Sequence, residues 1–113
     1  MKVEQQRVGT VDVLSVSGAL VDQDAEVFTK QLMSKIGAET KNPRIIVWLH
    51  EVPYMDSAAV EGLLTAADAL EQRAVNLKLA GVPGTCREIL ELTGVSGRFS
   101  YFKDVQDAVK SFL

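Results

Sequence analysis

The segment 45–49 constrains the fold more than any other part of the sequence. It reads Ile-Ile-Val-Trp-Leu, a continuous apolar run rich in β-branched and aromatic side chains. A short run of this kind is typical of a central strand that is covered on both faces of its sheet. Covering two faces takes helices, and segments with helical spacing of apolar residues follow and precede the run. The sequence therefore predicts an α/β layer architecture.

The other strand-like segments are short and separated by turn residues. Strands are expected at 2–8 and 11–17, joined by a two-residue hairpin turn in which Gly9 supplies the positive φ of the first position. The first of these strands is polar, which is typical of a sheet edge. Two more strands are expected at 75–80 and at about 99–102.

Four helices are expected from apolar residues that recur at helical spacing. The first runs from about Asp24 to Gly37, and the second begins near Ser57. The third contains Cys86, Ile89 and Leu90, and the fourth begins after an N-cap at Asp104. Asp22 or Asp24 could cap the first helix, and Gly94 stands where the third helix would end. The order ββαβαβαβα predicts a mixed, mainly parallel single sheet packed with about four helices and joined by right-handed crossovers.

Length and charge limit the classes of function. The 113 residues fit one domain, 1–113, and a formal net charge of -3 with both signs scattered argues against direct binding of nucleic acid. Cys86 is the only cysteine, so an intrachain disulfide is impossible and a reducing compartment is expected. No apolar run approaches the roughly 20 residues that cross a bilayer, and residues 1–7 do not resemble a signal peptide. We expect a cytoplasmic protein without membrane insertion.

The sequence gives little support for a catalytic or a metal-binding function. A triad of Ser57, His50 and Asp56 can be imagined, but no glycine-flanked nucleophile elbow surrounds the serine, and His50 is expected in a turn just past the central strand. One histidine and one cysteine cannot assemble a metal site. The turn at 81–85 could hold an anion but lacks the lysine of a phosphate-binding loop, so we expect a plain strand-to-helix turn. Cys86 is expected in the core. We expect no cofactor and no enzyme.

The segment 52–60 is the most informative candidate site. Asp56 and Ser57 are both good N-cap residues, and the simplest interpretation is that they only cap the second helix. Ala58 and Ala59, however, put small side chains on its first turn, and Tyr54 and Met55 place apolar groups beside it. The pattern predicts a small, smooth, partly apolar surface around a hydroxyl, suited to the active site of another protein.

Four segments together resemble the STAS domain of anti-sigma factor antagonists, in the same order and spacing. They are 13–20, 44–49 with 54–57, 79–82 and 90–95. The resemblance covers nearly the whole chain. Members commonly read Asp-Ser-Ser-Gly-Leu where this chain has Asp-Ser-Ala-Ala-Val at 56–60, and Val21 stands where an acidic residue is usual, with Asp22 beside it.

The resemblance implies a partner-switching regulator in signal transduction and transcription control. A serine kinase that doubles as an anti-sigma factor would bind this protein and phosphorylate Ser57, and a phosphatase would reset the switch. The implied partner-binding residues surround that serine; they are Asp22, Asp24, Tyr54, Met55, Asp56, Ala58, Ala59 and Glu61.

Three other functions stay open at this point. The chain could be an accessory subunit that docks on the ATPase of a lipid-transporting ABC system, with Ser57 only capping the helix. It could be a scaffold component of a larger stress-signalling particle. A hydrolase that uses Ser57 is the enzyme alternative.

Overall fold

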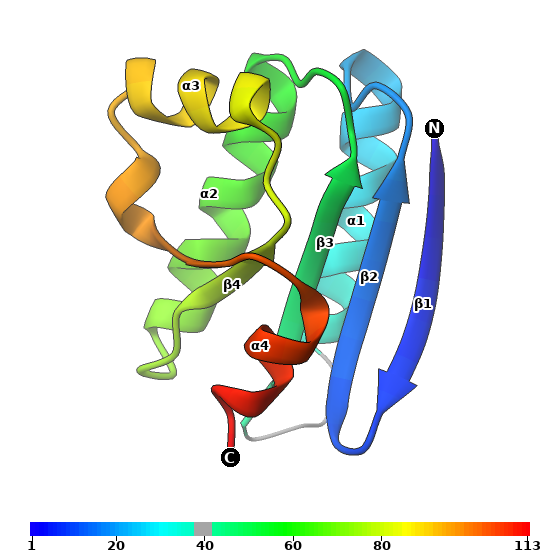
Figure 1. Cartoon of the computed structure of the whole chain (residues 1–113). Coiled ribbons are helices and arrows are strands. Elements are labelled where there is room, and N and C mark those ends of the chain that lie inside the picture. Colours follow the sequence, from blue (N-terminus) through cyan, green and yellow to red (C-terminus); the bar gives the residue numbers. More distant parts are fainter. Residues whose placement is uncertain (38–41) are drawn as a thin grey trace.

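The computed structural model describes residues 1–37 and 42–113, and within them the strands form one five-stranded sheet (Figure 1). The order across the sheet is β1 (Lys2–Val8), β2 (Val11–Ser17), β3 (Ile45–Glu51), β4 (Leu77–Ala80) and β5 (Phe99–Phe102). β1 runs antiparallel to β2, and β2 to β5 are parallel. The predicted mixed, mainly parallel sheet is confirmed.

The first two strands have the predicted bounds. Gly9 has a φ of 62° in the turn that pairs Val8 with Val11, a backbone conformation that costs glycine little. β1 lies at the edge of the sheet and is exposed along most of its length. Its polar side chains therefore face solvent, as expected of an edge strand.

β3 separates two apolar layers. Its alternate residues Ile45, Val47 and Leu49 belong to the larger core, which α1, α2 and α3 cover. Ile46 and Trp48 face the opposite way and pack with α4 in a smaller cluster. Figure 1 shows α1 and α2 behind the sheet and α4 in front of it. The prediction that helices cover both faces of this strand is confirmed.

β3 is two residues longer than expected, because Glu51 still pairs with Ser17 of β2. His50 consequently lies on the strand and not in a turn beyond it. Its ring stacks on that of Trp48, with the ring centroids 5.2 Å apart, so it points to the α4 side of the sheet.

The helices are α1 (Asp22–Gly37), α2 (Ser57–Glu71), α3 (Gly84–Leu92) and α4 (Val105–Lys110), with a short 3₁₀ turn at Ser96–Arg98. α1 begins two residues earlier than expected, because the carbonyl of Val21 accepts the backbone N–H groups of Asp24 and Ala25. The expectation that Asp22 or Asp24 caps it is wrong: Asp22 is the first helical residue, and the Asp24 carboxylate lies 3.8 Å from the N-terminal amine.

The helix ends explain the remaining boundaries. Asp104 caps α4 as predicted, accepting the Asp107 N–H at 2.8 Å. Gly94, with a φ of 76°, closes α3 in a Schellman motif in which Val95 N–H donates to the Leu90 carbonyl. The same motif ends α2, but there Ala74 holds the left-handed position with a φ of 57°. That turn uses Val75, so β4 begins at Leu77 and not at residue 75.

Cys86 is fully buried, as expected, and its Sγ lies 3.3 Å from the Val52 carbonyl oxygen. Burial raises the pKa of this thiol. In the part of the chain described, no helix combines the length and the apolar content that crossing a membrane would require.

Candidate functional site

The loop between β3 and α2 is fixed by main-chain hydrogen bonds to the segment that follows β2. Leu20 N–H donates to the Tyr54 carbonyl at 2.9 Å, and Asp56 N–H donates back to the Leu20 carbonyl at 3.3 Å. Leu20 and Met55 thereby form an isolated parallel bridge beyond the ends of the two strands. The start of α2 is therefore held beside the start of α1.

Asp56 joins the two helix starts through its side chain. Its Oδ1 accepts the Ala59 N–H at 3.1 Å, which makes Asp56 the N-cap of α2, and its Oδ2 accepts the Asp22 N–H at 2.8 Å. Asp22 has a φ of 49°, a left-handed conformation that aspartate tolerates better than most residues. The Asp22 N–H lowers the pKa of the Asp56 carboxyl below 3.8; partial desolvation opposes this shift, and the Ala59 N–H adds to it.

Ser57 follows the cap and is the first residue of α2. Its side chain is exposed, and its hydroxyl forms no hydrogen bond with any other residue in the ranges 1–37 and 42–113. The interpretation that both Asp56 and Ser57 cap the helix is therefore half right, because Asp56 alone fills that role. The Ser57 oxygen is accessible to another molecule, at a helix end where free backbone N–H groups favour negative charge.

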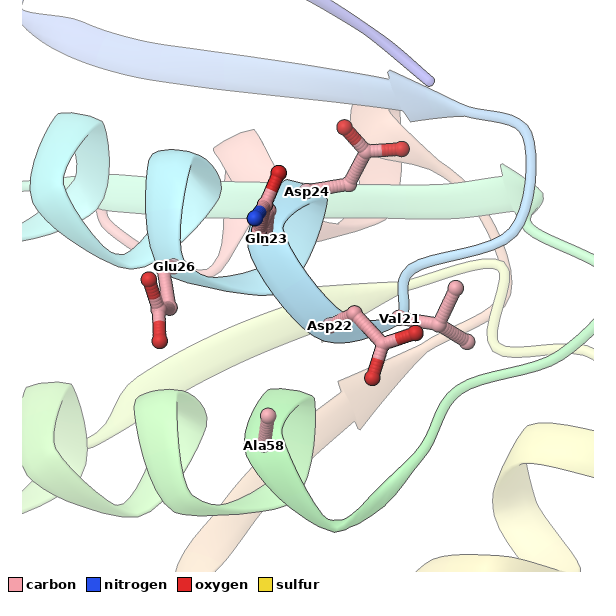
Figure 2. A pocket seen from close by; sticks show the side chains of 6 residues that line it. All are labelled: Val21, Asp22, Gln23, Asp24, Glu26 and Ala58. Carbon is pink, nitrogen blue, oxygen red and sulfur yellow. The ribbon is translucent and has the colours of Figure 1, made fainter.

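A shallow hollow beside Ser57 is acidic. It is lined by Val21, Asp22, Gln23, Asp24, Glu26 and Ala58. In Figure 2, Asp22 and Glu26 point toward the side of α1 where Ala58 lies, whereas Asp24 points the other way. The hollow continues into a more apolar groove between α1 and α2, which shares Glu26 and Ala58 and also includes Lys30 and Glu61. A partner that covers this surface would meet several carboxylates.

The two helices approach closely along this groove. A Cβ added at Gly62 of α2 would collide with the Thr29 side chain of α1. The Thr29 hydroxyl is turned back to the Ala25 carbonyl at 2.8 Å. The absence of a side chain at Gly62 therefore allows α1 and α2 to approach this closely.

Not all of the predicted partner-binding residues lie on the surface. Asp22, Asp24 and Glu61 are exposed, Tyr54 is 51% exposed, and Asp56 and Ala58 are half-buried. Met55 and Ala59, in contrast, are 1% and 0% exposed. Their expected place on the surface is wrong, because Met55 bridges to Leu20 inside the core and Ala59 lies on the inner face of α2.

Sequence reasoning missed Gln23 and Glu26, which line the hollow. The sequence held a signal for them. Parallel strands finish at the same end of a sheet, so the first turn of the helix after β2 lies next to the first turn of the helix after β3.

The imagined hydrolytic triad is not assembled. His50 points to the α4 side of the sheet, whereas α2 covers the opposite face. Both Asp56 oxygens accept backbone N–H groups and do not orient an imidazole. In the part of the chain that the structure describes, no group of three or more His, Cys, Asp or Glu side chains could hold a metal ion.

The sequence matches a known domain family, and the fold is similar to those of solved structures. The family model for the STAS domain matches residues 2–108. The fold is similar to that of an anti-sigma-factor antagonist (STAS) domain protein from Planctomyces limnophilus, with 16% identity, a TM-score of 0.86 and coverage of 96% of each chain. It is also similar to the Bacillus cell fate determinant SpoIIAA in its phosphorylated form, with 19% identity, a TM-score of 0.76, and 99% of this chain and 100% of that chain covered.

The same fold occurs in transporters. A sulfate transporter family protein from Wolinella succinogenes is 18% identical, with a TM-score of 0.74, and the match covers 92% of this chain and 85% of that chain. No curated protein matches the sequence.

Proposed function

The chain belongs to the STAS domain family, and from that premise we propose that residues 1–113 act as an anti-sigma factor antagonist. In this proposal the surface around Ser57 binds a serine kinase that is also an anti-sigma factor, and phosphorylation of Ser57 ends the binding. A phosphatase restores the unmodified serine. The cytoplasm is the compartment in which these partners would meet.

The observation that carries the proposal is the accessible Ser57 hydroxyl, which caps nothing because Asp56 caps α2. A kinase needs a hydroxyl that it can reach without unfolding its substrate. The phosphorylated form of the Bacillus protein supports modification within this fold. The transporter neighbour shows that the fold alone does not select a function, and neither neighbour favours the ABC-ATPase subunit or a scaffold role.

A phosphate at Ser57 would act on binding more than on folding. It adds about 1.5 to 2 negative charges and three acceptor oxygens. In the free protein the charge would face water at a helix N-terminus, which favours anions by about 0.3–1 kcal/mol. In a complex the same group would have to be desolvated beside Asp22 and Asp56. A coupling of about 1–3 kcal/mol would change affinity roughly 5- to 150-fold.

The first experiment identifies the kinase and maps the phosphate. The protein is captured from an extract of its own cells together with its bound partners, and its intact mass is measured. The captured kinase is then incubated with ATP and freshly purified, unmodified protein. We expect one phosphate on the wild type and none on Ser57→Ala. Thr65→Ala is the matched control, because it removes another exposed hydroxyl from the same helix. Phosphorylation that persists in Ser57→Ala would refute the proposed acceptor.

The second experiment separates charge from bulk by titrating the purified kinase against three variants. Ser57→Ala should bind like the wild type, Ser57→Asp should bind at least about fivefold more weakly, and Ser57→Asn should lie close to the wild type because it adds size without charge. Equal affinity for Ser57→Asp and Ser57→Asn would remove the electrostatic explanation.

A further inference from the structure

A second hollow lies at the end of the sheet where the parallel strands begin, opposite the end at which α1 and α2 start. Arg44 precedes β3, Asn76 precedes β4, Lys78 lies on β4 and Ser100 on β5. Ser111 and Phe112, just beyond α4, close one side of the hollow, whose volume is about 550 Å³. Figure 1 shows this end of the sheet beside the C-terminus, whereas α2 begins at the other end. Ser57 is therefore not part of this site.

Two cations, Arg44 and Lys78, line this hollow, and its described lining residues include no aspartate or glutamate. Neither Arg44 nor Lys78 lies within ion-pair distance of an acidic group in the ranges 1–37 and 42–113. Arg44 Nη1 donates to the Thr10 hydroxyl at 3.1 Å, and Lys78 Nζ donates to the Ser111 hydroxyl at 2.6 Å. Both lie over the Phe112 ring, with Nζ 3.6 Å and the guanidinium carbon 5.9 Å from its centroid.

The two positive charges repel each other. Desolvation, and secondly the charge of Arg44, lower the pKa of Lys78. The neutral groups nearby include hydrogen-bonding side chains, since the Asn76 amide contacts the Ser100 hydroxyl at 3.4 Å. In a chain of net charge -3, repelling cations grouped with amide and hydroxyl groups are the arrangement that a bound anion would stabilise.

We propose that Arg44 and Lys78 form a binding site for a small phosphate-bearing anion. The planar guanidinium of Arg44 suits two phosphate oxygens at once, and the Lys78 ammonium supplies a point charge with several donors. Asn76 and Ser100 complete the site as neutral partners. Bulk water reaches the open side of the hollow, so the rest of a phosphorylated small molecule would extend outward.

The hollow at the other ends of β3, β4 and β5 is the competing anion site. It contains His50, Arg87 and Lys103. There, however, Arg87 lies 3.9 Å from a Glu91 oxygen and Lys103 lies 3.8 Å from an Asp107 oxygen. Those cations already have acidic neighbours, and an added anion would have to compete with them.

The test is an amide NMR titration with inorganic phosphate and, separately, glycerol 3-phosphate, at constant pH and ionic strength. We expect saturable shifts centred on Asn76, Lys78 and Ser100. Tighter binding of one compound tells whether the ligand is a phosphomonoester or free phosphate. Lys78→Gln and Arg44→Gln should each weaken binding about tenfold or more, as expected for loss of a charged hydrogen-bond partner.

Lys103→Gln is the matched control, because it removes the same charge from the competing hollow; it should leave the dissociation constant unchanged. Unchanged amide shifts outside the site would show that each variant folds. In the wild type, phosphate should also raise the pKa of Lys78, which a direct side-chain titration measures. Shifts that do not saturate, shifts centred on residues 81–87, or equal weakening by Lys103→Gln would each overturn the proposal.

Discussion

Replacing Asp56 tests how the candidate site is built, independently of any partner. Its carboxylate accepts the Ala59 N–H within α2 and the Asp22 N–H of α1. Asp56→Ala removes both acceptors at once. Asp56→Asn keeps one acceptor oxygen, and asparagine caps helices as well as aspartate does, but its amide nitrogen is a donor and cannot accept from Asp22. The two variants therefore separate the cap from the bridge.

The magnitude follows from the two hydrogen bonds. Loss of an N-cap costs about 1 kcal/mol. The second bond involves a charged acceptor, but the side chain is only half-buried, so water can replace part of it and we assign about 0.5–1.5 kcal/mol. Asp56→Ala should therefore lower the free energy of unfolding by about 2 kcal/mol. At about 4 °C per kcal/mol for a domain of this size, the melting temperature should fall by roughly 8 °C.

Asp104→Ala is the matched control in urea or thermal unfolding. Asp104 caps α4 in the same way, and within residues 1–37 and 42–113 a single N–H, that of Asp107, donates to its side chain. It should cost about 1 kcal/mol, and Asp56→Asn should fall between the wild type and Asp56→Ala. Equal losses for Asp56→Ala and Asp104→Ala would show that the bond between the two helix starts contributes nothing.

The same site gives a pH dependence of definite sign. The folded chain lowers the pKa of Asp56 below 3.8. The stabilisation is therefore complete above that pH and is lost as the pH falls through the lower, folded-state value. The stability gap between wild type and Asp56→Asn should be constant from pH 7 to about pH 4 and should shrink below it. A gap of the same size at pH 7 and pH 2 would contradict the assignment.

Two further predictions concern the backbone. Ala74→Gly should raise the free energy of unfolding by about 0.5–1 kcal/mol in urea titrations, because Ala74 occupies a left-handed position that glycine adopts without strain. The converse variant Gly94→Ala should lower the free energy of unfolding. A loss of stability in Ala74→Gly, or a gain in Gly94→Ala, would refute the assignment of strain to these positions. Gly62→Ala should destabilise by about 1–3 kcal/mol through collision with Thr29. Thr29→Ala in that background should recover most of the loss in a double-mutant cycle, and no recovery would place the strain elsewhere.

Much of this fold follows from local patterns, because the patterns and the tertiary structure agree. The run 45–49 requires two covering layers, Gly9 and Gly94 have the backbone conformations expected of them, and Asp104 caps α4. The structure differs from the prediction where contacts with a segment distant in sequence determine where an element ends. β3 extends through Glu51 because β2 continues to pair with it.

The candidate site was harder to predict, since sequence shows which residues are near one another along the chain but not which face they share. Met55 and Ala59 are neighbours of Ser57 in sequence, yet both are buried. Glu26 is distant in sequence, yet it lines the same hollow as Ala58. Ala59, on the first turn of α2, already packs inward.

The division of roles between Asp56 and Ser57 bears most directly on function. Had the serine hydroxyl capped α2, its modification would have altered a bond that the helix needs, and phosphorylation would have changed stability together with binding. Here the carboxylate of Asp56 satisfies the Ala59 N–H and holds α1 in place. The neighbouring hydroxyl contributes no hydrogen bond to the described structure, so it can gain or lose charge at little cost to the fold. The proposed switch would need this separation, because each form would have to remain folded to meet its next partner.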